Sequence, residues 1–168
     1  MASGGTVHKL KANLAGQGVL THTLEAVRAS GLPMHLVDGI YPGMGDSIAA
    51  GVWATPQACG WLILPGDLPL ISARTLVTMA SELQHCKVAM PVYQGRKGHP
   101  VGFSADCRED LLGLQGDSGA ASVVRKYTPK LISVDDLGAV HDIDTLADLA
   151  LAEKLLQDGW AMRSGGHR

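Results

Sequence analysis

Asp67 has the residue type and position of a candidate metal ligand or catalytic carboxylate. It follows Trp61–Leu64, the most hydrophobic run in the chain, directly after Pro65 and Gly66. A carboxylate that follows a buried strand lies at the carboxyl edge of the sheet, where ligands bind in α/β proteins. The alternative is a structural role, because Gly-Asp is a common turn dipeptide. The position of Asp67 alone favours neither interpretation.

Asp142 and Asp144 form a second acidic position. They are two residues apart, so in an extended segment both carboxylates point to one side while Ile143 packs inward. A carboxylate here could also favour the start of the following helix electrostatically. Taken together with Asp67, however, carboxylates at strand ends resemble the oxygen-rich sites that Mg²⁺ prefers, completed by water and phosphate oxygens.

Three further segments could bind an anion or a substrate. The segment 43–47 (GMGDS) and the segment 116–120 (GDSGA) each precede an expected helix, whose N-terminal N–H groups favour anions. His99 lies in the segment 98–103 (GHPVGF), at a turn that enters an expected strand. Each segment also has an ordinary structural interpretation, as a helix start or a turn. Lys9 by itself would be interpreted as a surface residue.

Several function classes find no support. The sequence has no G-x-x-x-x-G-K-[ST], no G-x-G-x-x-G and no G-x-S-x-G motif, so the P-loop, Rossmann and hydrolase fingerprints are all missing. The net charge is −2 without a basic stripe, which argues against nucleic acid as a partner. No apolar run reaches membrane-spanning length. The three cysteines are far apart and form no C-x-x-C, so reduced thiols and a cytoplasmic location are expected.

The elements that would position these residues alternate between strands and helices. Helices are expected over 21–29, from 47 to 53, over 72–83 with Ser72 as N-cap, over 108–114, 120–127, and 146–156 with Thr145 and Asp148 as a capping pair. Strands are expected at 34–37, 61–64, 88–92, 101–103 and 131–134. This order predicts a three-layer α/β fold, a mostly parallel sheet with helices on both faces. We expect one domain over residues 1–162 and a disordered tail at 163–168.

The motifs in their order along the chain resemble one family. The sequence contains HKL (8–10), GMGDSIAAG (43–51), LPGDLPL (64–70), GHPVGF (98–103), GDSGA (116–120) and DIDTLADL (142–149). This set resembles the MobA-like nucleotidyltransferases over about residues 9–153, and it is most similar to the molybdenum cofactor cytidylyltransferase branch. The GHPVGF stretch favours the cytidylyl branch, because the guanylyl branch usually has a Gln-Pro-containing sequence there.

The resemblance implies a fold like that of the nucleotide-diphospho-sugar transferases and a Mg²⁺-dependent reaction. A terminal phosphate of molybdopterin would attack the α-phosphorus of CTP, and pyrophosphate would leave without a covalent enzyme intermediate. The resemblance also implies roles for individual residues: Asp67 and Asp144 as catalytic metal ligands, Lys9 as the catalytic cation facing the triphosphate, Gly43, Gly45, Ser47 and Gly66 with Lys9 at the nucleotide, and His99, Pro100 and Asp117 at the acceptor.

The start of the chain departs from the family pattern. The family begins with a buried strand and an L-A-A-G-x-x-x-R loop, whereas this sequence begins with Met1-Ala2-Ser3-Gly4-Gly5, so we expect an N-terminally truncated fold. Two alternatives therefore stay open: a nucleotide- or pterin-binding protein without turnover that assists a molybdoenzyme, and a transferase with another acceptor such as a sugar phosphate. An uncovered sheet edge would also be a reason to form a homodimer.

Overall fold

The computed structural model describes residues 13–14, 17–37 and 41–158. The tail expected at 163–168 and the predicted catalytic cation Lys9 lie outside the described residues. Near the start, β1 (Asn13–Leu14) and β2 (Gln17–Gly18) form a short antiparallel pair. No helix in the described ranges is long and apolar enough to span a bilayer.

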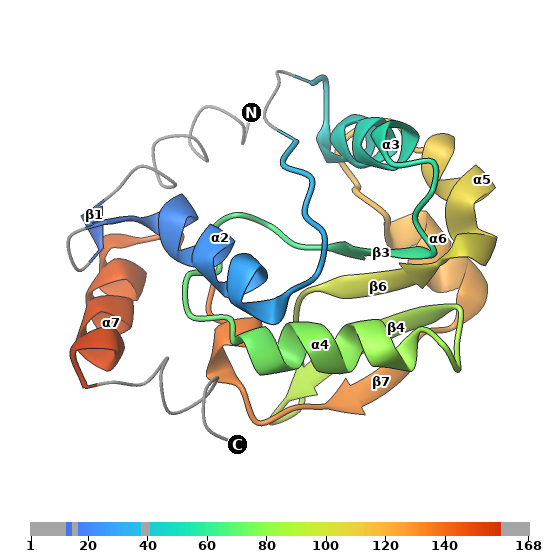
Figure 1. Ribbon diagram of the computed structural model, residues 1–168. Coiled ribbons are helices and arrows are strands. Elements are labelled where there is room, and N and C mark those ends of the chain that lie inside the picture. Colours follow the sequence, from blue (N-terminus) through green and yellow to red (C-terminus); the bar gives the residue numbers. More distant parts are fainter. Residues whose placement is uncertain (1–12, 15–16, 38–40, 159–168) are drawn as a thin grey trace.

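One mixed sheet forms the middle layer (Figure 1). Its strands are β3 (Gly60–Ile63), β4 (Val88–Tyr93), β5 (Arg96–Lys97), β6 (Val101–Ser104) and β7 (Lys130–Ser133), in the order β3-β6-β4-β5, with β7 pairing β4. Only the β4–β7 pairing is parallel; β3–β6, β4–β6 and β4–β5 are antiparallel.

The prediction of a mostly parallel sheet was therefore wrong in its pairings. β3, β4 and β7 share one direction, but β6 runs the opposite way between β3 and β4. The reason is the two-residue turn Gln94-Gly95, whose φ angles of 49° and 83° reverse the chain directly after β4. A parallel return would need a long crossover instead.

Helices cover both faces of the sheet, so the three-layer α/β class is confirmed (Figure 1). On one face, α2 and α4 contribute to the core that contains Leu68 and Ile71. On the other, α3, α5 and α6 enclose the core around Phe103. The bounds of the helices are α2 Val19–Ser30, α3 Met44–Ala54, α4 Ala73–Glu82, α5 Arg108–Leu112, α6 Ala121–Tyr127 and α7 Leu146–Gln157, with short 3₁₀ turns η1 (Ala105–Cys107) and η2 (Leu137–Ala139).

The β3–β6 register explains how both faces are filled. Phe103 pairs with Trp61, and both side chains are buried in the core that α3, α5 and α6 cover. Gly102 pairs with Leu62 and faces the opposite side. A Cβ on Gly102 would lie 3.1 Å from Cδ2 of Leu83, so glycine lets the end of α4 pack closely on the sheet.

The helix starts follow the expected capping chemistry. Ser72 caps α4 and its side chain accepts a hydrogen bond from the Thr75 N–H at 3.1 Å, as predicted. Thr145 and Asp148 form a complete capping box at the start of α7, which is also confirmed. Local sequence therefore determined these helix boundaries, because a cap needs only residues within one turn.

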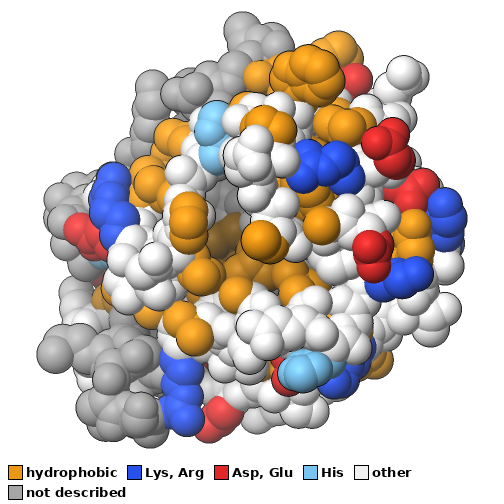
Figure 2. Space-filling model, turned by 45° about the vertical axis from the view of Figure 1, so that its right-hand side comes forward, with side chains coloured by type: hydrophobic (Ala, Val, Ile, Leu, Met, Phe, Trp, Pro, Cys, Tyr) orange, Lys and Arg blue, Asp and Glu red, His pale blue; other side chains and the backbone are white. Residues whose placement is uncertain are grey.

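The strand expected at 34–37 is not formed. The structure assigns this segment no strand, and Met34 and Leu36 are each 43 % exposed. Among the residues that the structure describes, the edge of β3 opposite β6 has no strand partner either. Figure 2 shows hydrophobic side chains gathered around a hollow in the face that it presents. An apolar segment without a strand partner gains no ladder hydrogen bonds, so hydrophobicity alone did not make a strand.

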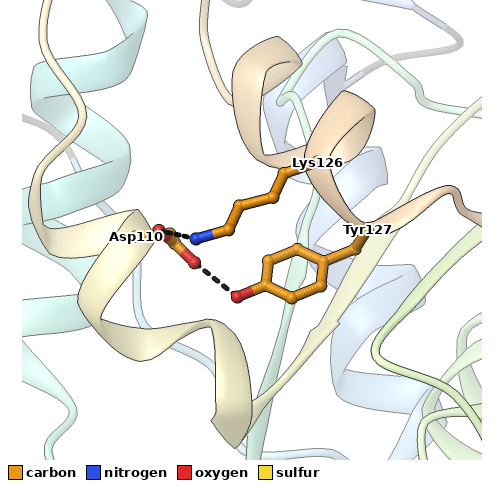
Figure 3. A network of polar contacts seen from close by, with 3 residues as sticks. All are labelled: Asp110, Lys126 and Tyr127. Atoms are coloured by element: carbon orange, nitrogen blue, oxygen red, sulfur yellow. Dashed lines mark hydrogen bonds and ion pairs between the residues drawn. The ribbon is translucent and has the colours of Figure 1, made fainter.

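A polar network ties α5 to α6 (Figure 3). Asp110 of α5 accepts hydrogen bonds from the Lys126 ammonium at 3.0 Å and from the Tyr127 hydroxyl. The Tyr127 hydrogen bond, followed by that of Lys126, holds the pKa of Asp110 below its ordinary value. The Lys87 ammonium also lies 5.6 Å from the centre of the Tyr127 ring.

Replacing Tyr127 by phenylalanine is expected to raise the pKa of Asp110. The network's contribution to stability is present above the unfolded-state pKa of about 3.9 and is lost as pH falls through the lowered folded-state value. NMR titration of the Asp110 carboxyl carbon measures the shift directly. An unchanged titration curve for Asp110 in Y127F would contradict the assignment of Tyr127 as the main cause.

Candidate active site

The two acidic segments meet through the main chain. After β3, the chain passes through Pro65 and Gly66 to Asp67, whose carbonyl accepts a hydrogen bond from the Ile143 N–H at 3.0 Å. Ile143 is 3 % exposed and packs with Val19, so its side chain faces the interior. This contact holds residues that are far apart in the sequence at one position.

Three carboxylates converge at this contact. Asp67, Asp142 and Asp144 each offer an oxygen, and these oxygens all lie within 4.8 Å of one another. The structure thus brings together the predicted pair Asp67 and Asp144, which the sequence places far apart. It adds Asp142, which sequence reasoning placed on the same side as Asp144 but which the family resemblance did not include among the ligands.

Neighbouring hydrogen bonds hold both acidic segments in place. The buried Thr23 hydroxyl of α2 donates to the Gly66 carbonyl at 2.8 Å. Gly66, predicted to bind nucleotide, thus helps to position Asp67 through its backbone. On the other side, the Asp148 carboxylate accepts hydrogen bonds from the N–H groups of Asp144 and Thr145, both at 3.0 Å. The capping box of α7 therefore also orients an acidic residue of the site.

The crowding of negative charge suits a divalent cation. Desolvation, then the adjoining Asp144 carboxyl and the charge of Asp67, raise the pKa of Asp142. A bound cation would relieve this repulsion, and hard oxygen donors suit Mg²⁺ or Mn²⁺ rather than a thiophilic metal. The donor set therefore fits the kind of metal that the sequence predicts.

A cavity of about 350 Å³ opens beside the carboxylates. Its lining residues include the acidic Asp67 and Asp142, the basic Arg96 and Lys97 of β5, and Met44 at the start of α3. Neither Arg96 nor Lys97 was among the residues predicted at the site. Their position after a hydrophobic strand is the one signal that could have indicated a site.

His99 lies on the wall of the same cavity. The backbone N–H of His99 donates to the Ala139 carbonyl at 2.9 Å, which fixes the backbone at that point. Burial lowers the pKa of His99, although the negative charge of Asp142 opposes this, and its buried Nδ1 has no hydrogen-bond partner among the described residues. The position of His99 is thus suitable for contact with a substrate. Pro100, predicted beside it at the acceptor, is fully buried, so its role is packing.

The residues predicted at the nucleotide make a different set of contacts. The Gly45 N–H donates to the Gly116 carbonyl at 2.8 Å, and the Gly116 N–H donates to the Asp46 carboxylate at 3.0 Å. A Cβ on Gly43 would lie 2.3 Å from the Gly116 oxygen, so glycine is required there for close packing. The Ser47 hydroxyl donates to the Met44 carbonyl at 2.8 Å. In this structure, Gly43 and Gly45 hold the loop at Gly116 against α3.

Asp117 lies beside Gly43 in this loop. A carboxylate oxygen of Asp117 would be 2.7 Å from a Cβ on Gly43, and Asp117 is not among the residues that line the cavity. Of the predicted acceptor residues His99 and Asp117, His99 alone therefore belongs to the described lining, and the acceptor role of Asp117 stays a prediction.

Two solved structures of low sequence identity share this fold. The protein Rv0371c of Mycobacterium tuberculosis H37Rv, crystallised as a complex with manganese, superposes with a TM-score of 0.73 and 21 % identity, over 87 % of this chain and 91 % of that one. The 2-C-methyl-D-erythritol 4-phosphate cytidylyltransferase of Thermus thermophilus superposes with a TM-score of 0.62 and 20 % identity, over 89 % of this chain and 93 % of that one.

Residues 19–131 match the MobA-like NTP transferase domain, and the chain belongs to this family. A curated relative, the purine catabolism protein PucB of Bacillus subtilis (strain 168), is 29 % identical over 120 residues, covering 67 % of this chain and 57 % of that protein. The chain thus spans little more than half the length of this relative.

Proposed function

We propose that this protein is a cytoplasmic, Mg²⁺-dependent nucleotidyltransferase that transfers CMP from CTP to molybdopterin and releases pyrophosphate. One observation carries the proposal: the carboxylates of Asp67, Asp142 and Asp144 converge, and Asp67 and Asp142 line the same cavity as the basic residues Arg96 and Lys97. Membership of the MobA-like family supports nucleotidyl transfer. The GHPVGF segment at 98–103 supports the cytidylyl branch and a pterin acceptor.

The chain's own residues act by positioning and by charge compensation. Asp67, Asp142 and Asp144 would hold the cation, which supplies charge neutralisation and Lewis acidity at the phosphate oxygens. Thr23 and Asp148 keep the two acidic segments in register. An oxygen of the acceptor phosphate forms a bond to the α-phosphorus of CTP as the bond from that phosphorus to the pyrophosphate oxygen breaks. No covalent enzyme intermediate is required.

His99 would contact the acceptor within the cavity. Its lowered pKa favours the neutral imidazole. A neutral ring adds no further charge beside Asp142. We therefore assign His99 a role in orienting the acceptor rather than in proton transfer.

The second candidate function is nucleotidyl transfer to an acceptor other than molybdopterin. Among the residues that the structure describes, the cavity lining includes two basic side chains but no large aromatic ring that would stack on a pterin. The T. thermophilus neighbour is named for a phosphorylated acceptor other than molybdopterin, which supports considering sugar-phosphate-like compounds. A nucleotide- or pterin-binding role beside a molybdoenzyme is the remaining alternative. The unpaired edge of β3 in the described sheet also supports a homodimer.

Pyrophosphate release tests the proposal. The purified chain is incubated with CTP, GTP, ATP or UTP, with Mg²⁺ or Mn²⁺, and with or without molybdopterin. We expect release only when CTP, the metal and molybdopterin are all present. Pyrophosphate release with CTP and a sugar phosphate, but not with molybdopterin, would show that the acceptor is a sugar phosphate instead. Saturable binding of CTP with no pyrophosphate from any combination would favour the binding role.

A further inference from the structure

The basic wall of the cavity is held in place by backbone contacts. Arg96 and Lys97 form β5, which pairs with the end of β4 in the register Tyr93↔Arg96 and Val92↔Lys97. The next residue, Gly98, donates its N–H to the Pro91 carbonyl at 2.9 Å and continues the ladder. The two cations therefore lie on a hairpin of fixed register rather than on a loose loop.

Arg96 is also attached to a second segment that lines the cavity. Its Nη2 donates to the Val140 carbonyl at 3.3 Å, and Val140 lines the same cavity. A guanidinium has five N–H donors in a planar fork, so this single bond leaves others for a ligand. Both Arg96 and Lys97 are exposed, and neither forms an ion pair with any residue in the described ranges.

The charged residues that line the cavity indicate the chemical class of the ligand. A phosphomonoester carries a charge of about −1.5 to −2 at neutral pH, and the carboxylates of Asp67 and Asp142 would repel it. Two cations that line the same cavity and have no carboxylate partner in the described ranges compensate for this repulsion, and an arginine fork matches two phosphate oxygens. An uncharged alcohol acceptor would gain little from such a wall.

We infer that Arg96 and Lys97 bind the terminal phosphate of the acceptor and select phosphomonoester acceptors over alcohols. The inference rests on the proposed nucleotidyl transfer, in which that phosphate supplies the attacking oxygen. The Arg96 guanidinium donates hydrogen bonds to two phosphate oxygens, and the Lys97 ammonium adds a second positive charge. The acceptor's phosphate then lies in the same cavity as Asp67 and Asp142.

Steady-state kinetics on Arg96→Gln, Arg96→Lys and Lys97→Gln test the assignment. Loss of a charged hydrogen bond corresponds to about a tenfold or greater rise in KM for the acceptor in Arg96→Gln. The KM for CTP is expected to stay within about twofold of wild type, since the triphosphate is not the ligand of this wall. Arg96→Lys keeps the charge but loses the fork, so it should recover only part of the acceptor affinity. Arg125→Gln, on the exposed part of α6, is the matched control and should behave as wild type.

Equilibrium binding separates this inference from the proposed function. Calorimetry measures the affinity of wild type and Arg96→Gln for molybdopterin and for its dephosphorylated form. Inorganic phosphate serves as the competitor. Wild type should prefer the phosphorylated form, phosphate should compete, and Arg96→Gln should lose the preference. This pattern without turnover would support the phosphate site while refuting transfer. Turnover with unchanged acceptor KM in Arg96→Gln, or a raised KM for CTP alone, would overturn the inference and leave transfer intact.

Discussion

Asp67→Asn and Asp144→Asn are each expected to reduce metal-dependent pyrophosphate release by about 100-fold or more, because losing even an outer-shell partner costs a metal site roughly 10–100-fold. The three carboxylates lie within 4.8 Å of one another, so removing one charge weakens the attraction for a divalent ion. The assay is pyrophosphate release at saturating CTP over a range of Mg²⁺ or Mn²⁺ concentrations. Unchanged release in either variant would refute the metal assignment.

Thermal unfolding shows whether these variants act through the metal or through the fold. Without metal, the repulsion between the carboxylates is smaller in each variant, so the melting temperature should be equal to that of wild type or higher. With Mn²⁺, wild type should melt at a higher temperature because the ion binds the folded state, and the variants should lose most of this rise. Asp106→Asn, an exposed aspartate in η1, is the matched control and should keep the full rise.

Asp136→Ala is expected to lower the free energy of unfolding by about 3 kcal/mol or more, through the loss of charged hydrogen bonds that are each worth about 1.5–3 kcal/mol. Asp136 is 2 % exposed. Its carboxylate accepts hydrogen bonds from the Ser72 N–H at 3.0 Å, the Thr75 hydroxyl at 2.7 Å and the Gly138 N–H at 2.9 Å. Alanine would leave all three donors buried without this acceptor.

Urea unfolding of Asp136→Ala beside Asp135→Ala measures this effect. Asp135 is the neighbouring aspartate but is exposed, so its substitution should change stability by less than about 0.5 kcal/mol. Equal losses in the two variants would show that the contacts of Asp136 are not the cause. Asp136→Asn keeps the volume but not the charge, and its stability should lie between wild type and Asp136→Ala.

Local patterns predicted the helices well because their signals lie within one turn. Ser72, Thr145 and Asp148 fixed the starts of α4 and α7 through caps that the structure contains. The run at 61–64 correctly indicated a strand, but in β3 only Trp61 is buried, and hydrophobicity does not specify the direction of the neighbouring strand. The antiparallel position of β6 depends on where a hairpin returns, which hydrophobicity does not encode.

The site was predictable where residue type and order sufficed. Asp67 and Asp144 meet as expected, although Asp144 follows η2 rather than a strand, because the Ile143 N–H joins the two segments. The roles of the glycines at 43 and 45 were not predictable, because packing against Gly116 and binding an anion both require glycine. Arg96 was missed because its partner, the Val140 carbonyl, is 44 residues further along the chain.

The bond from Arg96 to the Val140 carbonyl has a thermodynamic consequence. Val140 precedes Asp142 by two residues. A short backbone segment therefore connects Arg96, which would bind the acceptor, to the Asp142 carboxylate, which would bind the metal ion. Ordering either end of this piece removes part of the entropy cost of ordering the other. Occupancy by one ligand then strengthens the affinity for the second, and linkage requires the same factor in both directions. Binding of the acceptor and binding of the metal ion would thus be cooperative.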